Sequence, residues 1–205
     1  MGHDNEAMDE MQAMNFLLAG VGGQGVLVAA GILAEVGLQA GYDVKQSEIH
    51  GMAQRGGSVT SHVRWGRRVD APMAGRGEVD VLLGFEQLET LRYVEYLRPQ
   101  GRAFVSTHKI LPVSVTSGGA HYPEPAQLAG VLDQVTCDHV LVPAVDLATQ
   151  AGNARAHNVV LLGALSAALD LEPALWLEVV GRHVPAKALA VNQRAFELGR
   201  QAGAR

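Results

Sequence analysis

The chain has 205 residues, of which 48% are hydrophobic and 18% charged, and its formal net charge is −5. This length suits one compact domain with its own core, and the acidic balance excludes the strongly basic surface of a nucleic-acid-binding protein. The single cysteine, Cys137, excludes a disulfide framework or a Cys-ligated metal cluster built by this chain alone. We interpret Cys137 as a structural residue, and the low cysteine content favours a cytoplasmic location.

The N-terminal segment is acidic. Residues 1–13 are expected to form a disordered tail, and a secretory signal would require a basic start. The nearly uncharged stretch 16–34 is long enough to suggest a membrane span, but the glycines of residues 20–25 interrupt it with turn chemistry. We therefore expect no membrane segment, and we expect residues 14–205 to form a single domain.

Apolar patterning predicts alternating strands and helices along this domain. The expected strands are 16–19, 42–47, 59–65, 79–85, 102–106 and 140–143. The expected helices are 26–40, 86–97, 123–135, 146–151, 156–169, 173–182 and 186–202. This order predicts an α/β fold of three layers, in which an open, mostly parallel, Rossmann-like sheet is flanked by helices and followed by a helical C-terminal region. The first strand, helix and second strand form one predicted βαβ unit, with the intervening turn at the carboxyl edge of the sheet.

That turn is rich in glycine. Residues 20–25 read Gly-Val-Gly-Gly-Gln-Gly and match the G-x-G-x-x-G pattern between a strand and a helix. Glycine permits a tight turn and close approach of the backbone, and the N–H groups of a helix start favour an anion. The alternative is a turn that serves only packing. A dinucleotide site also needs an acidic residue about 20 positions further on, and Glu48 meets that spacing. The candidate binding residues here are Gly20, Gly22, Gly23, Gln24, Gly25 and Glu48.

A second loop, expected over residues 48–58, is dense in polar groups and glycine. Arg55 could grip a phosphate or carboxylate with its planar fork, and His50 carries a ring that titrates near neutrality. Together the two loops could form adjacent anion-binding backbones at one edge of the sheet. The alternative is a glycine hairpin with a solvated arginine. The candidates in this loop are His50, Gln54, Arg55, Gly56, Gly57 and Ser58.

Read together, the two loops resemble a known family. The resemblance rests on the glycine turn, on Glu48, on the run His-Gly-Met-Ala-Gln-Arg-Gly-Gly-Ser-Val at 50–59 and on His-Val-Arg at 62–64. It continues at 158–163 and 192–199 and covers nearly all of residues 14–200. These motifs resemble the β subunits of the indolepyruvate:ferredoxin oxidoreductases, which are similar to the γ subunits or domains of the 2-oxoacid:ferredoxin oxidoreductases. The sequence before Arg-Gly-Gly favours the indolepyruvate type over the pyruvate or 2-oxoglutarate type.

The resemblance implies one subunit of an enzyme that oxidatively decarboxylates a 2-oxoacid, with coenzyme A as co-substrate. Thiamine diphosphate, magnesium and 4Fe–4S clusters would lie on a large partner subunit, through which electrons reach ferredoxin. This chain would bind none of these cofactors alone, contribute no catalytic residue and be inactive by itself. Self-association without the partner is left open. A stand-alone NAD-linked dehydrogenase or a nucleotide-sensing module are the competing interpretations.

Several other residues have local interpretations. His62 is expected to be a strand residue, and Arg64 either reaches an anion or forms a surface ion pair. Asn158 is expected to cap the helix that follows it. Trp176 and Phe196 are expected to pack in the core, and no set of histidines has the spacing of metal ligands.

Overall fold

The computed structural model describes residues 12–51, 56–136 and 138–204. Its centre is a six-stranded sheet in the order β2-β3-β1-β4-β5-β6. The strands are β1 (Met14–Val21), β2 (Asp43–His50), β3 (Ser58–Gly66), β4 (Val79–Gly84), β5 (Leu97–Ser106) and β6 (Asp138–Val142). The helices are α2 (Val26–Gln39), α3 (Gln87–Tyr93), α4 (Val113–Thr116), α5 (Pro125–Val135), α6 (Ala144–Ala151), α7 (His157–Ser166), α8 (Pro173–His183) and α9 (Leu189–Gly203). Short 3-10 turns are η1 (Val94–Tyr96), η2 (Ala154–Ala156) and η3 (Ala186–Ala188).

The sheet is mostly parallel, as predicted, but its first unit is not a simple βαβ. Strand β3 pairs antiparallel with both β1 and β2 and lies between them, whereas β1, β4, β5 and β6 pair in parallel. The predicted unit of β1, α2 and β2 has parallel strands, but β3 is inserted between them, which the sequence analysis did not predict. The loop after β2 turns the chain back as a hairpin, so β3 pairs with β2. The other edge of β3 then pairs with β1. The turn after β1 still lies at the carboxyl edge.

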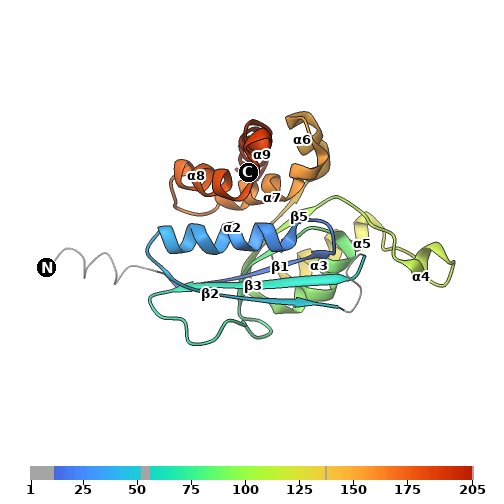
Figure 1. Cartoon of the computed structure of the whole chain (residues 1–205). Coiled ribbons are helices and arrows are strands. Elements are labelled where there is room, and N and C mark those ends of the chain that lie inside the picture. Colours follow the sequence, from blue (N-terminus) through green and yellow to red (C-terminus); the bar gives the residue numbers. More distant parts are fainter. Residues whose placement is uncertain (1–11, 52–55, 137, 205) are drawn as a thin grey trace, which may run out of the picture.

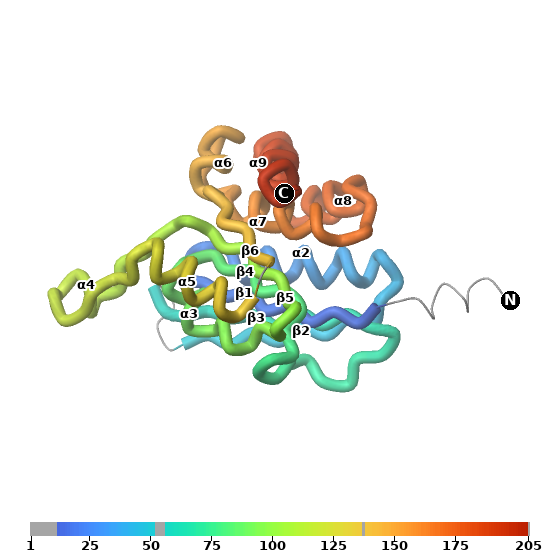
Figure 2. The backbone as a smooth tube through the Cα atoms, turned by 180° about the vertical axis from the view of Figure 1, so that it is seen from behind, coloured from blue at the N-terminus to red at the C-terminus, as the bar shows by residue number. Residues whose placement is uncertain are grey.

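Helices cover both faces of the sheet (Figure 1). On one face α2 and α7 pack on the strands, with α6, α8 and α9 outside them, and this face holds the larger core, around Phe16, Leu33 and Trp176. On the other face α3 and α5 cover a smaller core that includes Leu17 and Leu132. Figure 2, seen from behind, shows the same three layers. The α/β fold with its helical C-terminal region is confirmed.

Some expected boundaries were wrong. The loop expected over 48–58 is shorter, because residues 48–50 belong to β2. The helix expected over 86–97 ends at Tyr93, and β5 begins at Leu97 and runs through Pro99, so this proline lies inside a strand. A register shift between β4 and β5 at Val79 and Val81 accommodates that irregular start.

The described residues contain no helix that is both long enough and apolar enough to cross a membrane. Of the expected N-terminal tail, residues 1–11 lie outside the described part, and the two described residues, Gln12 and Ala13, are exposed. Cys137 also lies outside the described residues.

Candidate functional site

The glycine turn joins β1 to α2 at the carboxyl edge of the sheet. Gly23 and Gly25 have positive φ angles of 104° and 75°, a backbone region that favours glycine. At Gly20 a side chain would not fit, because a Cβ there would lie 2.8 Å from the Cβ of Phe85 and 2.9 Å from a methyl of Val26. By contrast, a Cβ on Gly23 would meet nothing within 4 Å, so this backbone faces open space. The turn therefore combines a packed base with an accessible tip.

The side chain of Gln24 is used inside the turn. It is buried, its Oε1 accepts the Val21 N–H at 2.8 Å, and its Nε2 donates to the Phe85 carbonyl at 2.9 Å. Its own N–H donates to the Val21 carbonyl at 3.1 Å. Gln24 thus links the ends of β1 and β4, and its side chain acts on a ligand only by shaping the turn.

The second loop lies directly against the first. The Gly22 N–H donates to the Gly57 carbonyl at 2.9 Å, and the Gly56 N–H donates to the Gly22 carbonyl at 3.5 Å. Val21 and Ser58 face each other across the β1–β3 pair, which sets this register. Residues 20–25 and 56–58 therefore form one continuous surface, which we call the glycine surface. The sequence predicted that these two loops would be adjacent.

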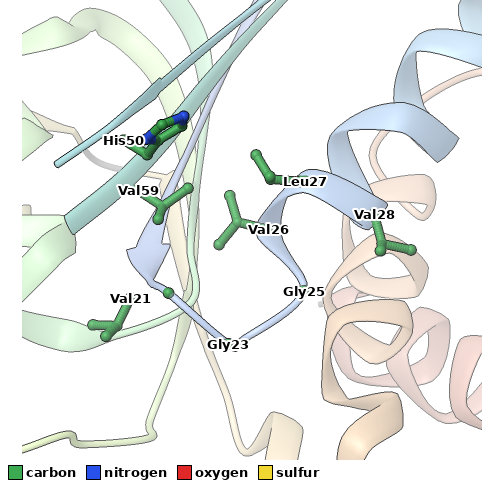
Figure 3. Close-up of a pocket in the computed structure, with 9 residues that line it drawn as sticks. Val21, Gly23, Gly25, Val26, Leu27, Val28, His50 and Val59 are labelled. Atoms are coloured by element: carbon green, nitrogen blue, oxygen red, sulfur yellow. The ribbon is translucent and has the colours of Figure 1, made fainter. Parts of the chain in front are cut away.

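An apolar cavity of about 480 Å³ opens beside this surface. Val26, Leu27 and Val28 from the first turn of α2 lie on one side, with His50 and Val59 from β2 and β3 on the other (Figure 3). Leu27 and Val28 remain 40% and 44% exposed, which is unusual for large aliphatic residues beside a cavity. The N–H groups of this helical turn have no intrahelical acceptor. The site thus offers main-chain donors at one end and an apolar wall for an uncharged group.

The other predicted residues have different surroundings. Ser58 bonds through its hydroxyl to the Tyr93 hydroxyl at 3.1 Å, towards α3. Glu48 is exposed on β2, accepts from Gln46 at 3.1 Å and does not line the cavity. Because β3 separates β2 from β1, Glu48 is not at the end of the neighbouring strand, where an acidic residue binds the ribose of a dinucleotide. Gln54 and Arg55 lie outside the described residues.

Two residues at the start of α7 reach the glycine turn from the C-terminal half. Asn158 donates from Nδ2 to the Gly25 carbonyl at 3.5 Å, and a Cβ on Gly25 would lie 2.7 Å from that nitrogen. The prediction that Asn158 caps its helix was wrong, because the helix begins one residue earlier. The pKa of His157 is lowered mainly by burial, while main-chain bonding to Ala154 and, more weakly, Gln24 opposes that shift. The family motif at 158–163, which begins with Asn158, was the sequence signal for this contact.

The remaining expectations concern residues away from the turn. His62 is a buried strand residue, as expected, and burial followed by the nearby Arg64 charge lowers its pKa. Arg64 forms no ion pair with any described residue; it donates to Asn15 and to the carbonyls of Ala71 and Met73, and so holds that loop. The core positions of Trp176 and Phe196 are confirmed, with ring centroids 6.1 Å apart. Within the described ranges, no group of three His, Cys, Asp or Glu residues could hold a metal ion.

A glycine turn before a helix at the carboxyl edge of a mostly parallel sheet defines an α/β protein of the Rossmann-like class. The family described as pyruvate ferredoxin/flavodoxin oxidoreductase matches residues 15–202, and the chain belongs to this family. It is a subunit of a 2-oxoacid:ferredoxin oxidoreductase, which confirms the resemblance predicted from the two loops.

Several relatives are similar over almost their whole length. The indolepyruvate oxidoreductase subunit IorB of Thermococcus kodakarensis is 42% identical over 192 residues, covering 92% of this chain and 95% of the relative. The protein of the same name from Pyrococcus horikoshii has the same identity and coverage. That from Archaeoglobus fulgidus is 40% identical over 190 residues, covering 91% of this chain and 93% of the relative.

Solved structures share the fold. The γ subunit of a keto/oxoacid ferredoxin oxidoreductase from Geobacter sulfurreducens has a TM-score of 0.69 at 22% identity and covers 93% of this chain and 98% of its own. The 2-oxoglutarate:ferredoxin oxidoreductase from Magnetococcus marinus, solved with 2-oxoglutarate, coenzyme A and succinyl-CoA, has a TM-score of 0.73 at 20% identity. The match covers 95% of this chain but 31% of that longer one.

Proposed function

We propose that this chain is the small subunit of an indolepyruvate-type oxidoreductase and that its glycine surface binds an anionic group, either the carboxylate of the 2-oxoacid or a phosphate of coenzyme A. The aromatic 2-oxoacid is supported by the names of relatives at 40–42% identity. The observation that carries the anion site is the start of α2 at the cavity, where the N–H groups of Val26, Leu27 and Val28 have no intrahelical acceptor. The bond from the Gly22 N–H to the Gly57 carbonyl, at 2.9 Å, joins the two loops beside them.

The division of labour with a partner is part of the same proposal. A 4Fe–4S cluster needs four cysteine thiolates, and this sequence has one cysteine. We therefore place the clusters, with thiamine diphosphate and magnesium, on a large partner subunit that passes electrons to ferredoxin in the cytoplasm. In this arrangement residues 14–205 act as one domain that binds, orients and shields a ligand. The reaction chemistry belongs to the partner.

Reconstitution tests the subunit role. Each subunit is purified alone and together, and reduction of a dye is measured with coenzyme A and indolepyruvate, pyruvate or 2-oxoglutarate. We expect activity only in the complex, with the highest kcat/KM for indolepyruvate. Preference for pyruvate or 2-oxoglutarate would overturn the aromatic assignment. Turnover by the isolated chain would overturn the division of labour.

A charge placed on α2 tests the anion site. Leu27 is exposed at the cavity, so Leu27→Glu adds a negative charge beside the turn without emptying the core. We expect KM for one anionic substrate to rise about tenfold, in line with 1–2 kcal/mol of repulsion at short range. Leu27→Gln tests the same change without charge, and Leu38→Glu adds the charge at the far end of α2, where Leu38 is 57% exposed. Equal KM values in Leu27→Glu and Leu38→Glu would exclude the anion site.

A further inference from the structure

Residues 107–124 connect β5 to α5 and project beyond the sheet, with α4 at their tip (Figures 1 and 2). We call them the projecting segment. Neither of the two hydrophobic cores of the described chain includes any residue of this segment. Connections inside a compact domain are usually only a few residues long, and long ordered ones usually carry a function. The packing of this chain alone therefore does not account for the segment.

The tip of the projecting segment is apolar and uncharged. Val113 is 80% exposed and Leu111 is 52% exposed, and Val113 is the most exposed large hydrophobic side chain in the described part of the chain. Residues 110–120 include no charged side chain, whereas 18% of the whole chain is charged. Depletion of charged residues marks the centre of a protein–protein interface. The tip thus has the composition of a surface that another protein covers.

The tip is also preformed. Its polar groups bond to one another: the Ser117 N–H donates to the Val113 carbonyl at 2.8 Å, and the Gly119 N–H donates to the Ser114 carbonyl at 2.9 Å. The Thr116 hydroxyl donates to the Val113 carbonyl at 3.1 Å. A tip that satisfies its own main chain presents its aliphatic side chains without first having to fold.

The base of the projecting segment is fixed to the core. The buried carboxylate of Glu86 accepts the Ile110 N–H at 3.1 Å and the Tyr122 hydroxyl, so one side chain holds both ends. The same carboxylate accepts the Glu89 N–H at 3.0 Å at the start of α3. An anchored segment loses less conformational entropy on binding than a free one, which favours a docking role.

The position of the projecting segment indicates which protein covers it. Strands β1, β4 and β5 run in the same direction, so the segment leaves β5 at the edge of the sheet that carries the glycine surface. The chain is a subunit of a 2-oxoacid:ferredoxin oxidoreductase. Under the proposed function, the glycine surface serves chemistry on the large partner subunit. That partner then lies at the edge beyond which the segment projects.

We propose that the projecting segment is a docking arm, and that Leu111 and Val113 at its tip insert into an apolar, uncharged recess on the large partner subunit. The apolar tip, its internal bonds and its anchored base carry the docking role. The choice of the large subunit as the occupant rests on the proposed function.

Amide hydrogen exchange of the parent chain tests the proposal without any substitution. Exchange is measured on the full chain alone and in the complex with the large subunit. We expect exchange at residues 111–119 to slow about tenfold or more in the complex. Residues 67–78, which follow β3 at the opposite edge of the sheet, should exchange at the same rate in both samples. Unchanged exchange at residues 111–119 would overturn the docking role.

A charged substitution at the tip gives the second test. Val113→Asp places a carboxylate on an exposed side chain, so the fold should be unaffected. We expect the Kd for the large subunit, measured by surface plasmon resonance, to rise about thirtyfold or more, as for an interface hot spot. Leu38→Asp is the matched control, because Leu38 is 57% exposed at the far end of α2. At saturating concentration, the Val113→Asp chain should restore the parent kcat.

The outcomes separate this proposal from the previous one. Equal Kd values for Val113→Asp and Leu38→Asp overturn the docking arm, whatever Leu27→Glu does to KM. If Val113→Asp weakens the complex while Leu27→Glu leaves the Michaelis constants unchanged, the docking arm stands and the anion site fails.

A second copy of this chain is the competing occupant of the tip. Sedimentation of the isolated chain measures its self-association. If Val113→Asp reduces self-association but leaves the Kd for the large subunit unchanged, a second copy covers the tip and the proposal is overturned.

Discussion

Gln24 and Phe85 are joined by a hydrogen bond of 2.9 Å, from the side-chain amide nitrogen of one to the main-chain oxygen of the other. The bond links the turn after β1 to the end of β4, across 61 positions of sequence. Because the oxygen of the same amide accepts the Val21 N–H, one buried side chain holds the turn from beneath. The accessible tip at Gly23 then rests on a fixed base.

Replacement of Gln24 should therefore affect stability first. Gln24→Met keeps the volume but leaves the Val21 N–H and the Phe85 carbonyl without their partner. We expect the free energy of unfolding to fall by about 2–6 kcal/mol, since each of the two buried polar groups left unpaired costs about 1–3 kcal/mol. Urea denaturation measures this. Gln39→Met, at the exposed end of α2, is the control. Unchanged stability with lost ligand affinity would instead assign Gln24 a direct contact.

A clamp at Glu86 holds the segment 107–124, which projects beyond the sheet with α4 at its tip (Figure 1). The buried Glu86 carboxylate accepts the Ile110 N–H at 3.1 Å and the Tyr122 hydroxyl, so it ties both ends of the segment. Burial, and then the bond to Glu86, raises the pKa of Tyr122 above its usual range.

Tyr122→Phe should loosen this segment. The lost bond to a charged acceptor is worth about 1.5–3 kcal/mol. The free energy of local opening of this segment should therefore fall by about the same amount. We expect limited proteolysis within 107–124 to accelerate about tenfold or more. Tyr42→Phe is the control, because the Tyr42 ring stacks on Trp65 and its hydroxyl has no partner among the described residues. Equal cleavage of both variants would show that the clamp does not restrain the segment.

Close packing of α7 on α9 depends on glycine. A Cβ on Gly199 would overlap the Val160 main chain, and a Cβ on Gly163 would overlap that of Phe196. Gly199→Ala should therefore lower the free energy of unfolding by about 1–3 kcal/mol, the usual cost of overpacking. Gly130→Ala in α5 is the matched test: a Cβ there meets nothing within 4 Å, so this variant should gain about 0.5–1 kcal/mol. Thermal unfolding should move the two variants in opposite directions.

The stability of the fold should also depend on pH. Burial lowers the pKa of His62 and of His157 below the ordinary value of 6.5, so both rings are held neutral in the folded chain. Between the folded and unfolded pKa values the unfolded chain binds more protons, and the free energy of unfolding therefore rises with pH. This stability is fully present above about pH 6.5 and is lost as the pH falls towards the lower, folded values.

Urea denaturation at several pH values between about 7.5 and 5.5 checks this dependence. In His62→Asn, where the amide oxygen can still accept the Ala74 N–H, the slope with pH should become shallower. His121→Asn, at an exposed position in the projecting segment, should keep the parent slope. A parent protein that gains stability towards pH 5.5 would contradict the assignment.

Much of the layout was predictable from the sequence because its signals are local. Periodic apolar residues predicted the alternation of strands and helices, and the glycines at 20–25 predicted a strand–turn–helix with an accessible backbone. The run at 50–59 predicted the family, and the family model confirms it. Each of these signals depends on residues within a single element and its adjoining turn.

Only the tertiary structure decided which elements meet. The insertion of β3 between β1 and β2 moved Glu48 away from the turn, and the inward side chain of Gln24 depends on a carbonyl in β4's neighbouring loop. Asn158 of α7 reaches Gly25 of the glycine turn across 133 positions of sequence. These contacts follow from strand pairing and helix packing between distant segments, which no local pattern encodes.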